Sequence, residues 1–131
     1  MKKFLFSFLV LALLAGCAKP VVDSENETEL NPEEIIAGDF SSIAGEYINS
    51  EGKITILDKE DIKRKLLDVI HADNEHCYLN VRTDDGFGVG LFIYNVGVEI
   101  PNLEGLTDTT KIRIYYGQDA PRYIEEIFNR K

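Results

Sequence analysis

The chain has 131 residues, with 14 basic and 23 acidic side chains and a formal net charge of −9 at pH 7. This surplus of acids argues against binding to nucleic acid and against electrostatic attraction to anionic lipid. The length allows one domain with one modest hydrophobic core.

Residues 1–16 have the pattern of an export signal. Lys2 and Lys3 precede an apolar run from Phe4 to Leu14, which is 11 residues long and is interrupted only by Ser7. A membrane-spanning helix needs about 20 apolar residues. The run therefore predicts a cleaved signal peptide over residues 1–16.

The tetrapeptide Leu14-Ala15-Gly16-Cys17 resembles the lipobox of bacterial lipoproteins at every position. The resemblance implies that Cys17 receives a diacylglycerol group and a palmitate-like acyl chain and becomes the first residue of the mature protein. Two chains anchor a protein stably to a bilayer. We expect an exported lipoprotein on the outer face of the cell membrane, with an outer membrane as the alternative site. The competing interpretation is an ordinary signal peptide followed by an incidental cysteine.

Residues 18–30 are acidic and contain one lysine and no aromatic residue. Such a segment buries too little apolar surface to become ordered. We therefore expect the lipidated cysteine and a disordered tether over residues 17–31, followed by a single domain over residues 32–131.

A short helix is predicted at the start of this domain. Asn31 can cap it, Pro32 suits its first position, and the acids Glu33 and Glu34 suit its positive end. Gly38 is placed to end it. The expected helix covers residues 32–37.

From Gly45 onward, apolar residues recur mainly at every second position, which is the period of a half-buried strand. Two turns are predicted, at residues 72–75 and at Asp84-Asp85-Gly86. Residues 87–96 are apolar on both faces, which indicates a central strand. The alternating sets are Ile54 with Ile56; Cys77 with Leu79 and Val81; and Ile112 with Ile114 and Tyr116.

Residues 61–70 and 122–131 fit the apolar spacing of a helix as well as a strand. We favour strands over residues 66–71 and 123–129. The fold class expected from these elements is mainly β, a small antiparallel barrel or curled sheet of about seven strands with a short N-terminal helix.

The stretch from residue 39 to residue 52 resembles the opening of a small domain found in lipoproteins of low-GC Gram-positive bacteria, with the pattern D-F-S-S-I-A-G-x-[WY]-x-N-x-x-G. The resemblance extends over about residues 33–131, with no match in residues 59–87. It implies an extracytoplasmic compartment and no biochemical activity, since none is assigned to that family. Tyr47 is expected to plug one end of the fold, with a ligand contact as the alternative. The motif residues are Asp39, Phe40, Gly45, Tyr47, Asn49 and Gly52.

The sequence contains no G-x-S-x-G, H-E-x-x-H or P-loop motif, so we expect no enzyme and no cofactor. The glycines from Gly86 to Gly90 are not followed by a helical pattern and are expected to be strand glycines. Cys77 is expected to be a buried small apolar residue, with a catalytic thiol as the lesser alternative.

No metal site is expected either. Of His71, His76 and Cys77, the last two point to opposite faces of a strand, so only His71 and Cys77 could meet across the hairpin. Two ligands fall short of the four that structural zinc needs. Residues 58–61 resemble the start of a calcium loop, but Lys63 stands where that loop needs glycine.

Two functions remain. The one favoured by the sequence is a protein-interaction module that presents an aromatic face, carrying Phe92 and Tyr94, to an envelope or host protein. The competing interpretation of that face is that another segment, such as residues 122–131 in a helix, covers it. The alternative is a lipocalin-like protein that binds a small ligand, which a cavity of about 300 Å³ or more would favour. The interaction module is preferred because so short a domain leaves little room for a wide cavity.

Overall fold

The computed structural model describes residues 29–131. The predicted signal peptide, the lipobox, Cys17 and most of the predicted tether lie outside the described residues. Within the described part, helices and strands follow one another in the order α2 (Pro32–Ile36), η1 (Ser41–Ile43), β1 (Gly45–Ile48), β2 (Ile54–Leu57), α3 (Lys59–Lys65), β3 (Leu66–Ala72), β4 (His76–Arg82), β5 (Gly88–Tyr94), β6 (Arg113–Gly117), η2 (Ile124–Glu126) and β7 (Phe128–Arg130).

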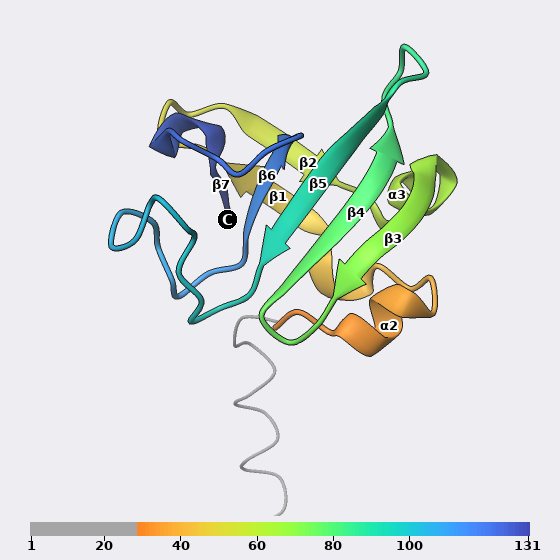
Figure 1. Ribbon diagram of the computed structural model, residues 1–131, viewed down its shortest axis with the longest axis horizontal. Coiled ribbons are helices and arrows are strands. Elements are labelled where there is room, and N and C mark those ends of the chain that lie inside the picture. Colours follow the sequence, from red (N-terminus) through yellow and green to blue (C-terminus); the bar gives the residue numbers. More distant parts are fainter. Residues whose placement is uncertain (1–28) are drawn as a thin grey trace, which may run out of the picture.

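In residues 29–131, seven strands form one antiparallel sheet with the order β2-β1-β7-β6-β5-β4-β3 (Figure 1). The two edge strands, β2 and β3, do not pair with each other, so the sheet is curled and is not closed into a barrel. This confirms the predicted mainly β fold and selects the curled sheet. The edge strands follow each other in the chain and are joined by α3, which therefore bridges the open side of the curl.

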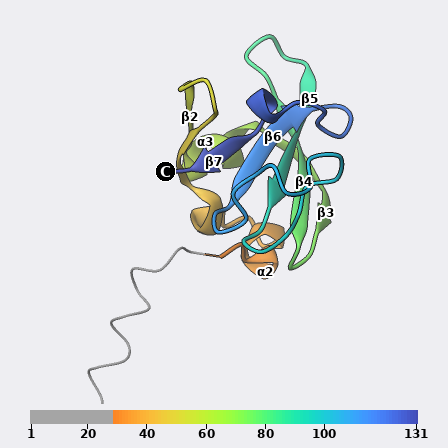
Figure 2. The same cartoon turned by 90° about the vertical axis from the view of Figure 1, so that its left-hand side faces the viewer.

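The main core lies on one face of the sheet and includes Ile35 of α2 and Ile43 of η1. Figure 2 shows α2 at one end of the sheet, close to β3. Cys77, Leu79 and Val81 of β4 all point into it, as their alternation predicts. A second, smaller cluster lies on the opposite face and includes Tyr94 and Tyr115. Both faces of the central strands are thus covered, which agrees with the prediction of a buried strand near residues 87–96.

The N-terminal helix forms as predicted and ends one residue earlier. The side chain of Asn31 accepts a hydrogen bond from the backbone N–H of Glu34 at 3.2 Å, and Gly38 follows the helix with a φ of +91°. Leu30 corrects the predicted tether boundary, because its side chain is buried in the main core. Its backbone N–H also donates to Asn95 Oδ1 at 3.0 Å, so the ordered domain begins before residue 32.

Residues 61–70 contain both of the elements that their spacing allows. Asp58 caps α3 by accepting hydrogen bonds from the backbone N–H groups of Glu60 and Asp61, at 3.1 and 2.9 Å. Three basic residues, at 63–65, occupy the last turn, where positive charge stabilises a helix. The strand prediction over 66–71 is confirmed by β3, whereas residues 61–65 are helical. The segment that resembles a calcium loop is therefore a helix cap.

Other predictions need correction. In residues 123–129, only Phe128 and Asn129 belong to a strand, because η2 occupies residues 124–126. Ile54 and Ile56 share a face as expected, but that face is solvent-exposed, at 52% and 63%, because β2 is an edge strand. Phe87, the first residue of the predicted central strand, lies in the β4–β5 loop and is 74% exposed.

Strand β6 also departs from simple alternation. Ile112 and Ile114 are buried as predicted, whereas Tyr116 is 38% exposed. Arg113 and Tyr115, which alternation places on a polar face, are buried as well. The second cluster covers that face. Its other members lie outside β6, so the alternation within β6 could not predict that they cover it.

Candidate functional site

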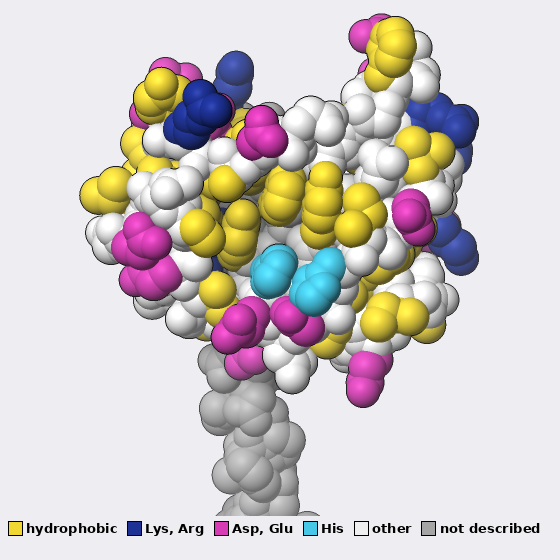
Figure 3. Space-filling view, in the orientation of Figure 1, with side chains coloured by type: hydrophobic (Ala, Val, Ile, Leu, Met, Phe, Trp, Pro, Cys, Tyr) yellow, Lys and Arg dark blue, Asp and Glu magenta, His cyan; other side chains and the backbone are white. Residues whose placement is uncertain are grey.

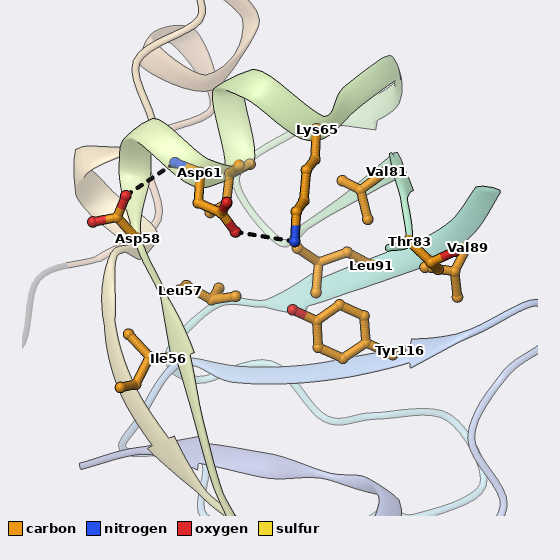
Figure 4. A pocket seen from close by; sticks show the side chains of 11 residues that line it. Ile56, Leu57, Asp58, Asp61, Lys65, Val81, Thr83, Val89, Leu91 and Tyr116 are labelled. Atoms are coloured by element: carbon orange, nitrogen blue, oxygen red, sulfur yellow. Dashed lines mark hydrogen bonds and ion pairs between the residues drawn. The ribbon is translucent and has the colours of Figure 1, made fainter. Parts of the chain in front are cut away.

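The open side of the curl contains a cavity of about 350 Å³, between α3, β2 and the neighbouring ends of β4, β5 and β6 (Figure 4). At this place α3 connects the two edge strands, β2 and β3, which do not pair with each other. The cavity lies in the space that such pairing would have closed. Its volume lies near the lower end of the range for small-molecule sites, about 300–1,000 Å³. Its lining residues are Ile56, Leu57, Asp58, Asp61, Ile62, Lys65, Val81, Thr83, Val89, Leu91 and Tyr116.

The walls of the cavity are mainly aliphatic. Leu57, Ile62 and Leu91 are buried residues of the main core and form its inner part. Val81 and Val89 face each other across the paired strands β4 and β5 and form one side. Such a surface attracts the apolar part of a ligand, because burying it removes apolar area from water.

The polar groups lie at one side of the cavity, on α3 and next to it. The Lys65 ammonium group points toward the cavity (Figure 4) and lies 3.4 Å from Asp61 Oδ2 and 3.3 Å from Asp84 Oδ1. Its hydrogen bonds with Asp84 and Asp61 raise the pKa of Lys65, so it stays charged. Asp58 also lines the cavity. The lining therefore carries two carboxylates, Asp58 and Asp61, against one ammonium group, and Asp61 is also paired with Arg64 of α3. The charged groups of the lining thus have an excess of one negative charge.

Tyr116 of β6 completes the polar side. Its ring lies across the cavity from Lys65 in Figure 4, with the hydroxyl group on the cavity side. Burial and the negative charge of Asp61 raise the pKa of Tyr116, while a hydrogen bond with Thr55 opposes this shift. The phenol is therefore neutral at physiological pH and can donate a hydrogen bond or accept one.

The aromatic face predicted to bind a partner is largely covered. Tyr94 is only 6% exposed and packs with Ile100, Leu103 and Ile127 in the second cluster. Phe92 is half-buried and stacks on Tyr78, with ring centroids 4.2 Å apart. Tyr94 is thus a packing residue and is not available as an exposed anchor. At this residue the structure has the covered face that the sequence left open as the alternative, with Ile127 among the covering residues.

The sequence analysis missed the cluster that the two histidines form. His71 and His76 lie on the same face of the β3–β4 hairpin, with ring centroids 4.7 Å apart. Asp73, in the turn between them, joins them: its carboxylate lies 2.7 Å from His71 Nε2. Cys77 points the other way, into the core, so it does not meet His71 as a second ligand. The sequence analysis did not consider Asp73, whose carboxylate lies two residues after His71 and could have indicated the third ligand.

The family-motif residues have structural roles in the first part of the chain. Tyr47 is fully buried and its hydroxyl donates to the Ile43 carbonyl at 2.7 Å, which agrees with the expected plug. Asp39 accepts hydrogen bonds from the backbone and side chain of Ser41, at 3.0 and 2.6 Å. Phe40 is buried in the main core, and Gly45 has a φ of +146° beside the Arg130 side chain.

Asn49 and Gly52 build the β1–β2 turn. The Asn49 side chain accepts from the backbone N–H groups of Glu51 and Lys53, at 3.0 and 2.8 Å, and donates to the Glu125 carbonyl at 2.9 Å. Gly52 has a φ of +85°, which glycine adopts readily. These six residues have structural roles, and none of them lines the cavity.

Comparison with family models, with curated proteins and with solved structures finds no match for this chain. Among the described residues, no helix has the length and apolar character needed to cross a membrane. The cavity and the histidine cluster are therefore interpreted from their own geometry.

Proposed function

We propose that this protein is an envelope lipoprotein that binds a small, mainly apolar ligand in the cavity beneath α3. The cavity of about 350 Å³ is the observation that supports this function. It exceeds the size at which ligand binding becomes preferable to the interaction module, and the burial of Tyr94 removes one of the two anchors of that module. The ligand-binding alternative is thus the better supported of the two.

The lining of the cavity limits the chemistry of the ligand. The aliphatic walls favour an alkyl chain or a single ring, since the volume is near the lower limit for ligand sites. At the polar side, Lys65 is already paired with Asp61 and with Asp84, which lies outside the cavity, and Asp61 also pairs with Arg64. Among the lining residues, Asp58 and Asp61 exceed Lys65 by one negative charge. A hydroxyl or ammonium end group suits this environment, and a carboxylate is repelled by it.

Three ligands of equal chain length test this proposal: n-hexanol, n-hexylamine and hexanoate. We expect the first two to raise the melting temperature and to shift the methyl NMR signals of Val81, Val89 and Leu91, and hexanoate to act more weakly. Val89→Trp should fill the cavity and remove these effects. Val98→Trp, at a half-buried valine in the β5–β6 loop that does not line the cavity, is the matched control.

The proposal fails if the three ligands produce no saturable shift at the cavity methyl groups. It also fails if Val89→Trp, shown to be folded by circular dichroism, binds hexanol as tightly as the unchanged protein. A preference for hexanoate would leave the cavity as a binding site but would overturn the assigned end-group chemistry.

The anchoring part of the proposal rests on the lipobox, which lies outside the described residues. Cys17→Ser should abolish labelling of the protein with a radioactive fatty acid in growing cells and release it from the membrane fraction. Ser24→Ala, in the predicted tether, should leave both unchanged. Undiminished labelling of Cys17→Ser would contradict lipidation.

A further inference from the structure

The β3–β4 hairpin brings three metal-ligating side chains to one end of the sheet. Ala72 pairs with Cys77 and His71 pairs with Tyr78, so His71 and His76 emerge on the same face on either side of the turn. Asp73 begins that turn. Figure 3 shows the two imidazoles side by side, below a row of apolar side chains and next to acidic ones.

The turn holds the carboxylate in place between the imidazoles. Asp73 Oδ1 accepts hydrogen bonds from the backbone N–H groups of Glu75 and His76, both at 2.9 Å. Its other oxygen, Oδ2, lies 2.7 Å from His71 Nε2, and His76 Nδ1 lies 3.7 Å from Oδ1. Backbone contacts therefore fix the position of the carboxylate, and the two imidazoles approach it from either side.

The spacing of these groups suits a single ion. One ligand atom from each of His71, Asp73 and His76 can be chosen so that all three lie within 4.8 Å of one another. Ligand atoms about 2.0–2.2 Å from a tetrahedral ion are themselves about 3.3 Å apart. The three side chains are 39–47% exposed, so small rotations about their side-chain bonds can close the difference.

The donor set defines the class of ion. Two imidazoles and one carboxylate suit Zn²⁺ or Cu²⁺, whereas Ca²⁺ and Mg²⁺ prefer sites made only of oxygen. Three protein ligands leave at least one coordination position open to water or to another molecule. The partial exposure of all three side chains agrees with such an open site.

We propose that His71, Asp73 and His76 form a surface binding site for one divalent transition-metal ion of the zinc and copper type. This site is separate from the cavity, since none of its three residues lines that cavity. The turn-forming role of Asp73 accounts for the carboxylate alone. It does not account for two imidazoles that stack on each other and converge on its oxygens.

Titration of zinc chloride into the full chain, purified in detergent without a polyhistidine tag, tests the site by calorimetry. We expect one ion per chain, with His71→Ala and His76→Ala each weakening binding about tenfold or more. Asp73→Asn is the sharpest variant, because its amide oxygen can still accept the two turn hydrogen bonds while the charged ligand oxygen is lost. Asp85→Asn, at an exposed acid in the other hairpin turn, is the matched control and should bind zinc as the unchanged protein does.

A second measurement needs no variant. Substoichiometric CuCl₂ should broaden the NMR signals of His71, Asp73 and His76 first, because a paramagnetic ion relaxes the nuclei closest to it. The proposal is overturned if zinc shows no saturable binding, if Asp73→Asn and both histidine variants bind zinc as well as the unchanged protein, or if the copper-induced broadening is centred elsewhere in the chain.

Discussion

Replacing Arg113 by lysine tests the view that this buried guanidinium group holds the long β5–β6 connection on the sheet. The side chain is fully buried. Its Nε donates to the Lys111 carbonyl at 2.9 Å, one terminal nitrogen donates to Thr107 Oγ1 at 2.9 Å, and the other donates to the Asn95 carbonyl at 2.6 Å. Asn95 stands at the start of the connection, and Thr107 and Lys111 stand near its end. One side chain therefore joins the two ends of this segment.

The expected loss of stability follows from the geometry of the guanidinium group, whose three nitrogens donate in different directions. An ammonium group at the end of a flexible chain cannot reproduce three diverging bonds and can keep about one of them. Each hydrogen bond to a charged group contributes about 1.5–3 kcal/mol. Burial lowers the pKa of Arg113, and the charges of Glu99 and Asp108 oppose this shift. The guanidinium group stays charged, because its ordinary pKa is so high. Losing two bonds therefore costs about 3–6 kcal/mol.

Urea denaturation followed by circular dichroism measures this loss, and a fall of about 12 °C or more in the melting temperature should accompany it. Amide exchange should increase mainly over residues 95–112. Arg82→Lys, at an exposed arginine of β4, is the control and should change stability by less than about 0.5 kcal/mol. A loss below about 1 kcal/mol for Arg113→Lys, or an unchanged exchange pattern, would refute the assigned role.

Three further substitutions or reactions test the packing. Cys77 is fully buried and burial raises its pKa to about 11, so a thiol reagent at pH 8 should react only after unfolding, and fast reaction in the folded state would contradict this. Gly90→Ala would place a Cβ 2.5 Å from the backbone oxygen of Gly117 and should lower the free energy of unfolding by about 1–3 kcal/mol. Gly88→Ala would meet only side-chain atoms and should cost less. Equal effects of the two substitutions would argue against the close backbone approach at Gly90. Tyr94→Ala should destabilise by about 3 kcal/mol or more, and Phe92→Ala by less, as urea denaturation can show; a near-neutral Tyr94→Ala would reopen its exposed role.

The alternation of apolar residues predicted the β class, the two hairpin turns and the inward face of β4. It did so because a side-chain period of two depends only on the local backbone. It could not distinguish an edge strand from an inner one. Ile54 and Ile56 alternate as core residues do, yet they face solvent, because no neighbouring strand covers the outer edge of β2.

The histidine cluster shows a different limit of sequence reasoning. The ligands of a site on a hairpin depend on which residues face each other across the turn, and register shifts in β3 alter that relation. From the sequence, only His71 and Cys77 could meet across the hairpin. The irregularity between Val69 and His71 instead leaves His71 on the outer face, where Asp73 and His76 can join it.

The cavity could not have been predicted, because it arises from how the curl closes. A sheet of this length could have ended in a barrel if β2 had paired with β3, and the interior would then have been filled by side chains alone. Here the seven residues of α3, with Asp58 as their cap, occupy that position. A helix presents side chains around an axis and cannot continue the hydrogen-bonded ladder, so space remains between its inner face and the strands opposite. The short domain was expected to leave little room for a cavity. The cavity depends less on chain length than on the fact that a helix, α3, and not a strand, lies between the two edges of the sheet.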